Sequence, residues 1–212
     1  VIELMGGIEP ARTQLLTAIS AGADVVTANK ALLATHGPEL FDAADQVGAS
    51  VYYEAAAAGA IPIIRPLRDL LAGDRVQRIM GIVNGTTNYI LDRMDTEGAD
   101  FGEVLAQAQA LGYAEADPTA DVEGYDAAQK AAILASLAFH TSVPLEAVHR
   151  EGITAIDKPM MDAARKAGYV IKLLAVCERV ANGSGDAISV RVYPALVPRE
   201  HPLASVHGAN NA

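Results

Sequence analysis

Residues 1–55 alternate between short apolar segments and helical patterns, and this alternation limits the fold more than any other feature of the sequence. Strands are expected at 1–5, 24–29 and 50–55, and helices from Pro10 to about Ala21 and over 38–47, with Gly22 and Gly48 ending them. Strands that are separated by helices in this way form a parallel sheet covered by the helices. The fold class predicted for this part of the chain is therefore α/β.

From about residue 56 the order of the elements changes. Helices are predicted at 61–71, 86–94, 101–111, 124–142 and 159–167, and strands at 76–84, 169–180 and 187–197, the last two joined by a hairpin loop at 181–186. Because these helices and strands no longer alternate regularly, they indicate an α+β unit. A boundary near residues 55–60 is expected to separate this unit from the parallel sheet.

The composition argues against several classes of function. The 212 residues carry a net charge of −10, and phosphate binding requires clustered Lys and Arg, so nucleic acid is not expected as a partner. The only cysteine, Cys177, lies in an apolar strand pattern and is expected in the core, so neither an internal disulfide nor a Cys-based zinc site is predicted. The histidines lack metal-ligand spacing and are interpreted as structural or surface residues. No stretch approaches the ~20 apolar residues of a membrane helix.

The first residues, VIELMGG, begin in the middle of a predicted strand. They include neither an initiating Met nor the basic segment of a signal peptide. We therefore expect an internal piece of a longer protein that works in the cytoplasm and not in a membrane.

The segment LGYAEADPTADVEGYDAAQKAAIL, residues 111–134, places five carboxylates before one lysine and then becomes apolar. Asp126 and Lys130 share a face of the predicted helix, and the plain interpretation is an acidic first turn with a surface ion pair. The alternative is a binding site, because the acids lie in a loop punctuated by Gly and Pro. Lys130 precedes the apolar run AAILASLAF and is expected to be partly buried. Carboxylates beside such a lysine suit a small cationic substrate that undergoes proton transfer.

Two other segments also have both a functional and a structural interpretation. GIVNGTTNYIL (81–91) is predicted to end a strand and start a helix, where backbone N–H groups either face a ligand or are simply capped. TANK (27–30) places Lys30 just beyond the carboxyl end of a strand, which is where ligands bind in parallel sheets. The residues alone leave these alternatives open.

Taken together, these segments resemble homoserine dehydrogenases. The resemblance covers almost the whole chain, in order through ELMGGIEPA, TANKALLA, YYEAAAAGAIPII, GIVNGTTNYIL, LGYAEADPTADVEGYDAAQK, GITAIDKPMMDAARKAGYVIKLLA and LASVHGANNA. It implies reversible oxidation of L-homoserine to L-aspartate 4-semialdehyde with NAD or NADP, a step in threonine and methionine biosynthesis. It also implies a partial Rossmann-type nucleotide domain at 1–55, an α+β catalytic and dimerisation domain at 56–200, a return segment at 201–212, and a homodimer or homotetramer.

The resemblance also implies roles for individual residues. Proton transfer falls to Lys130 and Lys30, with Asp126 positioning substrate and base; substrate contacts fall to Glu115, Asp121, Asp126 and Thr86, and cofactor contacts to Lys30, Gly112 and Gly208. A monovalent cation, usually sodium, is implied at Glu54 and the carbonyls of Ala57, Gly59 and Ile61. The alternative there is a plain turn in which Glu54 pairs with a basic side chain. Glu115 would bind the ammonium group of homoserine while Lys130 takes the hydroxyl proton as hydride leaves the same carbon.

The sequence departs from the family pattern in two places. The G-x-G-x-x-G turn of the cofactor domain is not among these residues, so the choice between NAD and NADP stays open. Asn210 stands where the family more often has a bulky apolar residue.

Two other functions are compatible with parts of this sequence pattern. A dehydrogenase of another small amino acid or semialdehyde is one, but an aldehyde-oxidising type would need a reactive cysteine, and Cys177 is a poor candidate. A catalytically silent binding or dimerisation module is the other. It is disfavoured because Lys130, Asp126 and Glu115 are all present.

Overall fold

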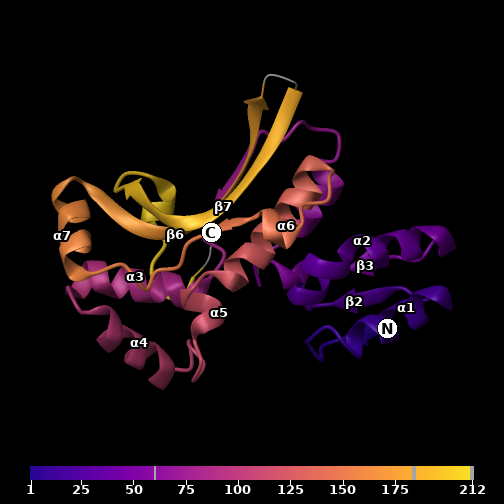
Figure 1. Ribbon diagram of the computed structural model, residues 1–212, viewed down its shortest axis with the longest axis horizontal. Helices are drawn as coiled ribbons and strands as arrows, with labels where there is room; N and C mark the ends of the chain where they lie inside the picture. Colours follow the sequence, from indigo (N-terminus) through magenta and orange to yellow (C-terminus); the bar gives the residue numbers. More distant parts are fainter. Residues whose placement is uncertain (60, 183–184, 211–212) are drawn as a thin grey trace. The chain divides into compact units, whose positions relative to one another are not determined.

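The computed structural model describes residues 1–59, 61–182 and 185–210, and the chain divides into two compact units (Figure 1). Unit 1 comprises Val1–Gln77 with Ala132–Ala147, and unit 2 comprises Arg78–Ala131 with Val148–Ala212. The mixed α/β fold class predicted from the sequence is confirmed. The finer division at residues 55 and 200 stays a prediction.

Unit 1 contains the predicted parallel sheet. Its strands lie in the order β1 (Ile2–Glu3), β2 (Val25–Thr27), β3 (Val51–Tyr52), and they are connected by α1 (Ala11–Ser20) and α2 (Lys30–Val47). Crossovers between neighbouring parallel strands share one hand, so both helices cover the same face of the sheet.

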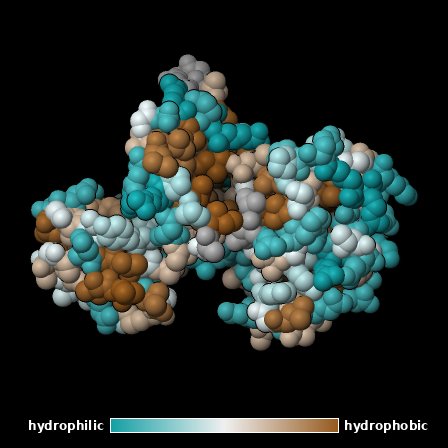
Figure 2. Space-filling model, turned by 180° about the vertical axis from the view of Figure 1, so that it is seen from behind, coloured by the Kyte–Doolittle hydropathy of each residue, from teal (hydrophilic) through white to brown (hydrophobic). Residues whose placement is uncertain are grey.

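The two faces of this sheet differ in exposure. On β2, Val25 and Thr27 are buried beneath the helices, whereas Val26 points to the other side and is exposed. Ile2 and Tyr52 are exposed on the same side as Val26. Figure 2 shows apolar surface gathered over unit 1, at the lower left.

Several predicted elements of unit 1 have different ends in the structure, and three of them differ most. The helix predicted at 38–47 begins earlier, at Lys30, because Asn29 caps it and Pro38 is tolerated inside it. The strand predicted at 50–55 ends at Tyr52, and a 3-10 turn follows at Glu54–Ala56. The helix predicted at 61–71 is reduced to short helical turns, including the π-type turn Pro66–Leu70.

Unit 2 is built on a four-stranded mixed sheet. Its order is β4 (Arg78–Gly81), β6 (Tyr169–Asn182), β7 (Gly185–Pro198), β5 (His149–Arg150). β6 runs antiparallel to β4 and β7, while β5 pairs parallel with β7. Both long strands extend beyond their predicted ends into the predicted loop 181–186, and β4 is shorter than the strand predicted at 76–84. Residues 183–184 of that loop lie outside the described residues.

The helices of unit 2 pack against this sheet and each other. They are α3 (Gly85–Glu97), α4 (Phe101–Ala110), α5 (Thr119–Val122), the first part of α6 (Tyr125–Phe139) and α7 (Lys158–Lys166), with a 3-10 turn, η4, at Pro202–Ser205. α3 and α7 pack on β6, and α4 packs on α3 (Figure 1). The short elements α5 and β5 were not predicted. In the described part of the chain, no helix has the length and apolarity that a membrane crossing requires.

Strand β6 forms the centre of unit 2 and is buried on both faces from Val170 to Cys177. One face presents Val170, Leu174 and Val176 to a cluster that includes Leu203 of η4. Cys177 lies on the other face and is 0% exposed, as predicted, and this burial raises the pKa of its thiol to about 12.

Candidate active site

A polar cluster forms in unit 2 where the loop after β4 meets the first turn of α3. Asn84 caps this helix, because its Oδ1 accepts a hydrogen bond from the backbone N–H of Thr87 at 2.8 Å. Its Nδ2 then donates to Asp121 Oδ1 at 2.7 Å and to Asp126 Oδ2 at 3.0 Å. Since the cap fixes the amide group, both amide hydrogens are directed at carboxylates.

Lys130 joins this cluster from the second turn of α6. Its Nζ forms a salt bridge with Asp126 Oδ2 at 2.9 Å and donates to the carbonyl of Val83, also at 2.9 Å. The Lys130 side chain is 16% exposed and that of Asp126 is 8% exposed. The predicted i,i+4 pair and the partial burial of Lys130 are therefore confirmed, and Asp126 Oδ2 accepts from both Asn84 and Lys130.

The five carboxylates of segment 111–134 do not form a single cluster. Asp121 and Asp126 gather around Asn84, whereas Asp117 Oδ1 accepts the N–H and the hydroxyl of Thr119, and these hydrogen bonds lower the pKa of Asp117. Glu123 accepts the hydroxyl of Thr154. Some of these acids therefore order turns and Asp126 pairs with Lys130, and the interpretation as a binding site stays a prediction.

Thr86, Gly112 and Glu115 lie where α3 meets the loop after α4. The Thr86 hydroxyl donates to the carbonyl of Tyr113 at 2.6 Å, which ties the first turn of α3 to this loop. Gly112 has a φ of 75° and ends α4, where its N–H donates to Gln109. Glu115 is exposed, and its carbonyl accepts a hydrogen bond from the Gln109 side chain at 3.0 Å.

Lys30 lies in unit 1, where it is the first residue of α2 and half-buried. A chain of hydrogen bonds fixes the backbone just before it. Thr27 Oγ1 donates to Glu3 Oε2 at 2.5 Å and accepts from the N–H of Asn29 at 3.0 Å. The Asn29 amide in turn donates to the carbonyl of Gly7 at 2.6 Å.

Glu3 also orders the turn that follows β1. Its Oε1 accepts the N–H groups of Met5 at 2.7 Å and Gly6 at 3.0 Å. Burial raises the pKa of this carboxyl, but the hydrogen bonds from Thr27 and from these two N–H groups outweigh it, so the pKa is lowered overall. Gly6 and Gly7 have φ values of 75° and 73°, and added Cβ atoms would meet nothing within 4 Å. A cofactor can therefore approach this backbone closely at the carboxyl end of the sheet, which fits a nucleotide.

The predicted cation residues form a compact turn in unit 1. Glu54 Oε1 accepts the N–H of Ile64 at 2.8 Å and Oε2 accepts the N–H of Arg65 at 2.9 Å, so both carboxylate oxygens bind backbone groups, whereas the plain alternative expected a basic side chain. The N–H of Ile61 donates to the carbonyl of Ala58 at 3.1 Å, and Gly59 has a φ of 60°. Among the described residues, no group of three or more His, Cys, Asp or Glu could hold a metal ion.

The sequence reasoning missed a second polar group in unit 2. Lys172 of β6 is 2% exposed, and its Nζ donates to Asn88 Oδ1 at 3.0 Å and to the carbonyl of Val206 at 2.7 Å. Burial lowers the pKa of Lys172, although Asp92 and Asp95 oppose this effect. The available signal was a lysine inside the apolar run YVIKLLAVC. Asn84 was also missed, although it stands in GIVNGTTNYIL.

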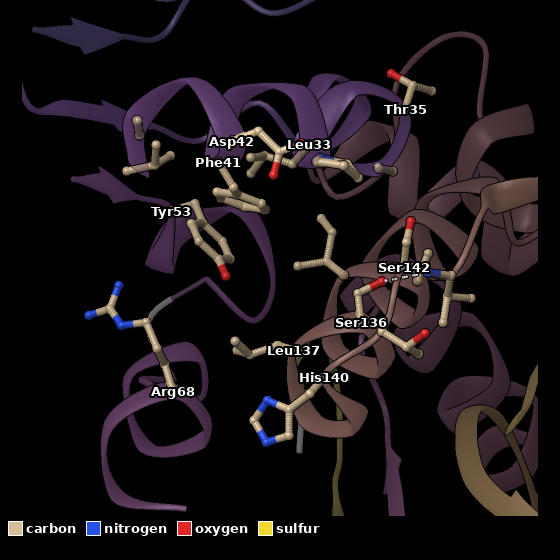
Figure 3. Close-up of a pocket in the computed structure, with 18 of the residues that line it drawn as sticks. Leu33, Thr35, Phe41, Asp42, Tyr53, Arg68, Ser136, Leu137, His140 and Ser142 are labelled. Carbon is tan, nitrogen blue, oxygen red and sulfur yellow. Dashed lines mark hydrogen bonds between the residues drawn. The ribbon is translucent and has the colours of Figure 1, made fainter. Parts of the chain in front are cut away.

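A pocket of about 980 Å³ lies within unit 1 (Figure 3). Leu33 and Phe41 reach it from α2, and the Tyr53 ring lies 5.4 Å from that of Phe41. Leu137 and His140 line it from the end of α6 and the loop beyond. None of the residues predicted for substrate, cofactor or cation line this pocket.

Comparison with known proteins shows a consistent match. The family model described as homoserine dehydrogenase matches residues 62–212, and the one described as homoserine dehydrogenase, NAD binding domain, matches residues 1–54. The homoserine dehydrogenases of Corynebacterium glutamicum and Mycobacterium tuberculosis are 59% and 60% identical over 213 residues, covering 100% of this chain and 48% of each relative.

Solved structures agree with these relatives. A homoserine dehydrogenase from Thiobacillus denitrificans is 48% identical with a TM-score of 0.95, over 100% of this chain and 48% of that one. A hyperthermophilic archaeal homoserine dehydrogenase in complex with NADPH is 30% identical with a TM-score of 0.81, over 99% of this chain and 59% of that one. The chain thus spans about half the length of the curated relatives it matches.

Proposed function

This chain belongs to the homoserine dehydrogenase family, and we propose that it is part of an NAD(P)-dependent enzyme that interconverts L-homoserine and L-aspartate 4-semialdehyde. Such an enzyme serves threonine and methionine biosynthesis from aspartate. The observation that carries the proposal is the cluster of Asn84, Asp121, Asp126 and Lys130, because it combines a half-buried base with oriented carboxylates.

Substrate binding is assigned to the acidic residues of segment 111–134 and to the first turn of α3. Homoserine carries an ammonium group, and the carboxylates of Glu115 and Asp121 are groups that bind ammonium. Asp121 is held by Asn84, while Glu115 is exposed on the loop that Thr86 ties to α3. Thr86 keeps a hydroxyl oxygen that accepts a further hydrogen bond, which suits the substrate hydroxyl or ammonium.

Proton transfer is assigned to Lys130 and Lys30. Lys130 is held by Asp126 and by the carbonyl of Val83, which fix the direction of its Nζ. During oxidation Lys130 takes the proton of the substrate hydroxyl, and during reduction it returns that proton. The bound nicotinamide supplies the other half of the reaction by accepting or donating hydride.

Cofactor contacts are assigned to Lys30, Gly112 and Gly208. The open Gly6–Gly7 turn and Lys30 follow neighbouring strands of the parallel sheet at its carboxyl end. Either NAD or NADP fits this assignment. An assay of the full-length enzyme with each cofactor distinguishes them through kcat/KM.

A monovalent cation, sodium by preference, is proposed at Glu54 and the carbonyls of Ala57, Gly59 and Ile61. Each carboxylate oxygen of Glu54 accepts one backbone N–H and retains a second lone pair for an ion. One carboxylate with neutral carbonyls suits a singly charged ion better than a divalent one. A high-resolution crystal structure grown in sodium tests this. Density coordinated by the three carbonyls is expected, and carbonyls that diverge with no density between them would contradict it.

The whole enzyme is proposed to work in the cytoplasm as a homodimer or homotetramer. In the described residues, β7 pairs with β5 only at Arg191 and Val192, so much of its outer edge is available to a second copy. Nicotinamide cofactors are kept inside cells, which supports the location. Sedimentation of the full-length protein and cell fractionation test these two points.

The decisive experiment for the activity uses the full-length enzyme with L-homoserine and each oxidised cofactor. Formation of the reduced nicotinamide, followed by its absorbance, is the expected result. L-serine, which lacks one methylene group, serves as the matched control substrate. Equal turnover of both substrates, or turnover of neither, contradicts the proposed function.

A further inference from the structure

We propose that Asn88, Asp92 and Lys172 are positioning residues that hold segment 206–208 in the conformation that contacts the nicotinamide cofactor. These three side chains are called the clamp below. The inference rests on the proposed function, because the proposed cofactor contact at Gly208 is what gives the segment its role.

The clamp holds the backbone of the segment at both ends. Asn88 Nδ2 donates to the carbonyl of Val206 at 3.2 Å and to the carbonyl of Gly208 at 2.9 Å. The N–H of Gly208 donates to Asp92 Oδ2 at 2.8 Å, and Asp92 Oδ1 lies 2.7 Å from Nδ1 of His207. Gly208 therefore has both its N–H and its C=O bound by side chains of α3, which fixes the orientation of its peptide groups.

Lys172 completes the clamp from β6. Its Nζ donates to the carbonyl of Val206 at 2.7 Å and to Asn88 Oδ1 at 3.0 Å, and lies 4.0 Å from Asp92 Oδ1. Because the Asn88 oxygen accepts from the ammonium, its two amide hydrogens must point the other way, toward segment 206–208. Lys172 thus acts on the segment directly and also through Asn88.

The core does not require a lysine at this position. Lys172 shares a face of β6 with Val170, Leu174 and Val176, which pack in the apolar cluster. Removing an ammonium group from water is costly, and replacing a whole buried ion pair by apolar residues of similar volume is often neutral or stabilising. What an apolar residue could not supply is the pair of hydrogen bonds to Asn88 and Val206.

Helix α3 links the clamp to the proposed chemistry. Asn84, Asn88 and Asp92 are spaced four residues apart and so lie along one face of α3. Asn84 orients Asp121 and Asp126, while Asn88 and Asp92 hold segment 206–208. One face of α3 thereby positions both the proposed substrate-binding carboxylates, Asp121 and Asp126, and the proposed cofactor contact at Gly208.

The test is Lys172→Met in the full-length enzyme, with Lys166→Met, which alters an exposed lysine of α7, as the matched control. Methionine fills similar space and removes both donors. We expect the Kd for NADPH, measured by its fluorescence, and the KM for cofactor to rise about tenfold, as for loss of a hydrogen bond to a charged group. The KM for homoserine should not change, whereas the thermal midpoint should fall modestly, because Asn88 Oδ1 and the Val206 carbonyl lose a buried donor.

A merely structural role for Lys172 also lowers the thermal midpoint but leaves the Kd of the folded protein unchanged. That result overturns the proposal. Hydrogen exchange supplies a readout independent of activity, because the N–H of Gly208 should exchange faster in Lys172→Met. Faster exchange with an unchanged Kd for NADPH also overturns the proposal. In that case Lys172 would hold segment 206–208 in place, but this would not affect cofactor binding.

Failure of the proposed function is distinguishable from failure of the clamp. A wild-type enzyme that binds NADPH without oxidising homoserine contradicts the function, while the Kd of Lys172→Met still decides the clamp. If Lys172→Met does not fold, Asn88→Leu provides the same comparison, because it removes the two donors to segment 206–208. An unchanged Kd in Asn88→Leu overturns the proposal.

Discussion

The two lysines proposed for proton transfer lie in surroundings that differ in kind. In unit 1 the hydrogen bonds next to Lys30 run through Glu3, Thr27 and Asn29 and mainly fix backbone groups. In unit 2 Lys130 is held by the Asp126 side chain, which is itself oriented by Asn84. In the proposed function, unit 1 therefore shapes turns for the cofactor and presents Lys30, whereas unit 2 orients the side chains around Lys130.

This difference predicts that substitutions in the two units will change different measured quantities. Substitutions in the unit 2 cluster should lower turnover or substrate binding with little loss of stability. Substitutions in the unit 1 network should lower stability with little effect on kcat. Each prediction below tests one side of that separation.

The largest effect is expected from Lys130→Ala in the full-length enzyme. Proton transfer is lost, and such groups are typically worth ~10²–10⁴-fold in rate. A methyl group fits the helix, so circular dichroism and the thermal midpoint should match the wild type. Lys166→Ala, at an exposed position of α7, is the control. More than about a tenth of the wild-type kcat in Lys130→Ala removes this residue from the catalytic role.

A smaller loss of turnover is expected from Asn84→Ser. Serine keeps an oxygen to cap α3 but removes the amide donors to Asp121 and Asp126. Misplacement of reacting groups can cost on the order of 10²-fold, so kcat should fall while stability is retained. Asn84→Ala is the matched comparison, because it also removes the cap and should cost about 1 kcal/mol of unfolding free energy. Equal stability losses in the two variants would show that the cap does not matter.

Glu115→Gln should act on binding rather than on chemistry. A neutral amide replaces the carboxylate proposed to face the substrate ammonium, so KM for homoserine should rise about tenfold with little change in kcat. Glu103→Gln, which alters an exposed acid on α4, is the control. An unchanged KM takes Glu115 out of the substrate site.

The fold of unit 1 could be predicted because its signals are local. Short apolar segments between helical patterns specify a parallel sheet, and glycines mark the helix ends. The start of α2 was misplaced because Pro38 is typical of a helix start, whereas here it lies inside the helix and Asn29 supplies the cap. Element ends that depend on one side-chain hydrogen bond are not visible in periodicity.

The candidate site in unit 2 was predictable only in part. The pair of Asp126 and Lys130 follows from helical spacing, and both residues belong to one element. Asn84 and Lys172 were missed because their partners are distant in sequence, for example Asn84 with Asp121 and Lys172 with Asn88. Only the tertiary fold brings such groups together.

The smallest effect, and the test of the unit 1 side of the comparison, is Glu3→Gln. Glu3 is 4% exposed, and its carboxylate accepts hydrogen bonds from Thr27 and from the N–H groups of Met5 and Gly6. Glutamine keeps only one acceptor oxygen, so the unfolding free energy at neutral pH should fall by about 1 kcal/mol. The kcat should not change, because Glu3 is assigned no contact with substrate.

The pH dependence of this loss separates the carboxylate from simple packing. The pKa of Glu3 in the folded protein is lowered from 4.5, because the hydrogen bonds outweigh the effect of burial. The charged form therefore stabilises the fold above pH 4.5, and this contribution is lost as the pH falls from 4.5 through the folded-state pKa. The difference between wild type and Glu3→Gln, measured by urea unfolding at a series of pH values, should narrow below pH 4.5. If the difference in unfolding free energy stayed constant across the pH series, Glu3 would contribute through its packing and not through its charge. A fall in kcat in Glu3→Gln would contradict the prediction that substitutions in the unit 1 network affect stability and not turnover.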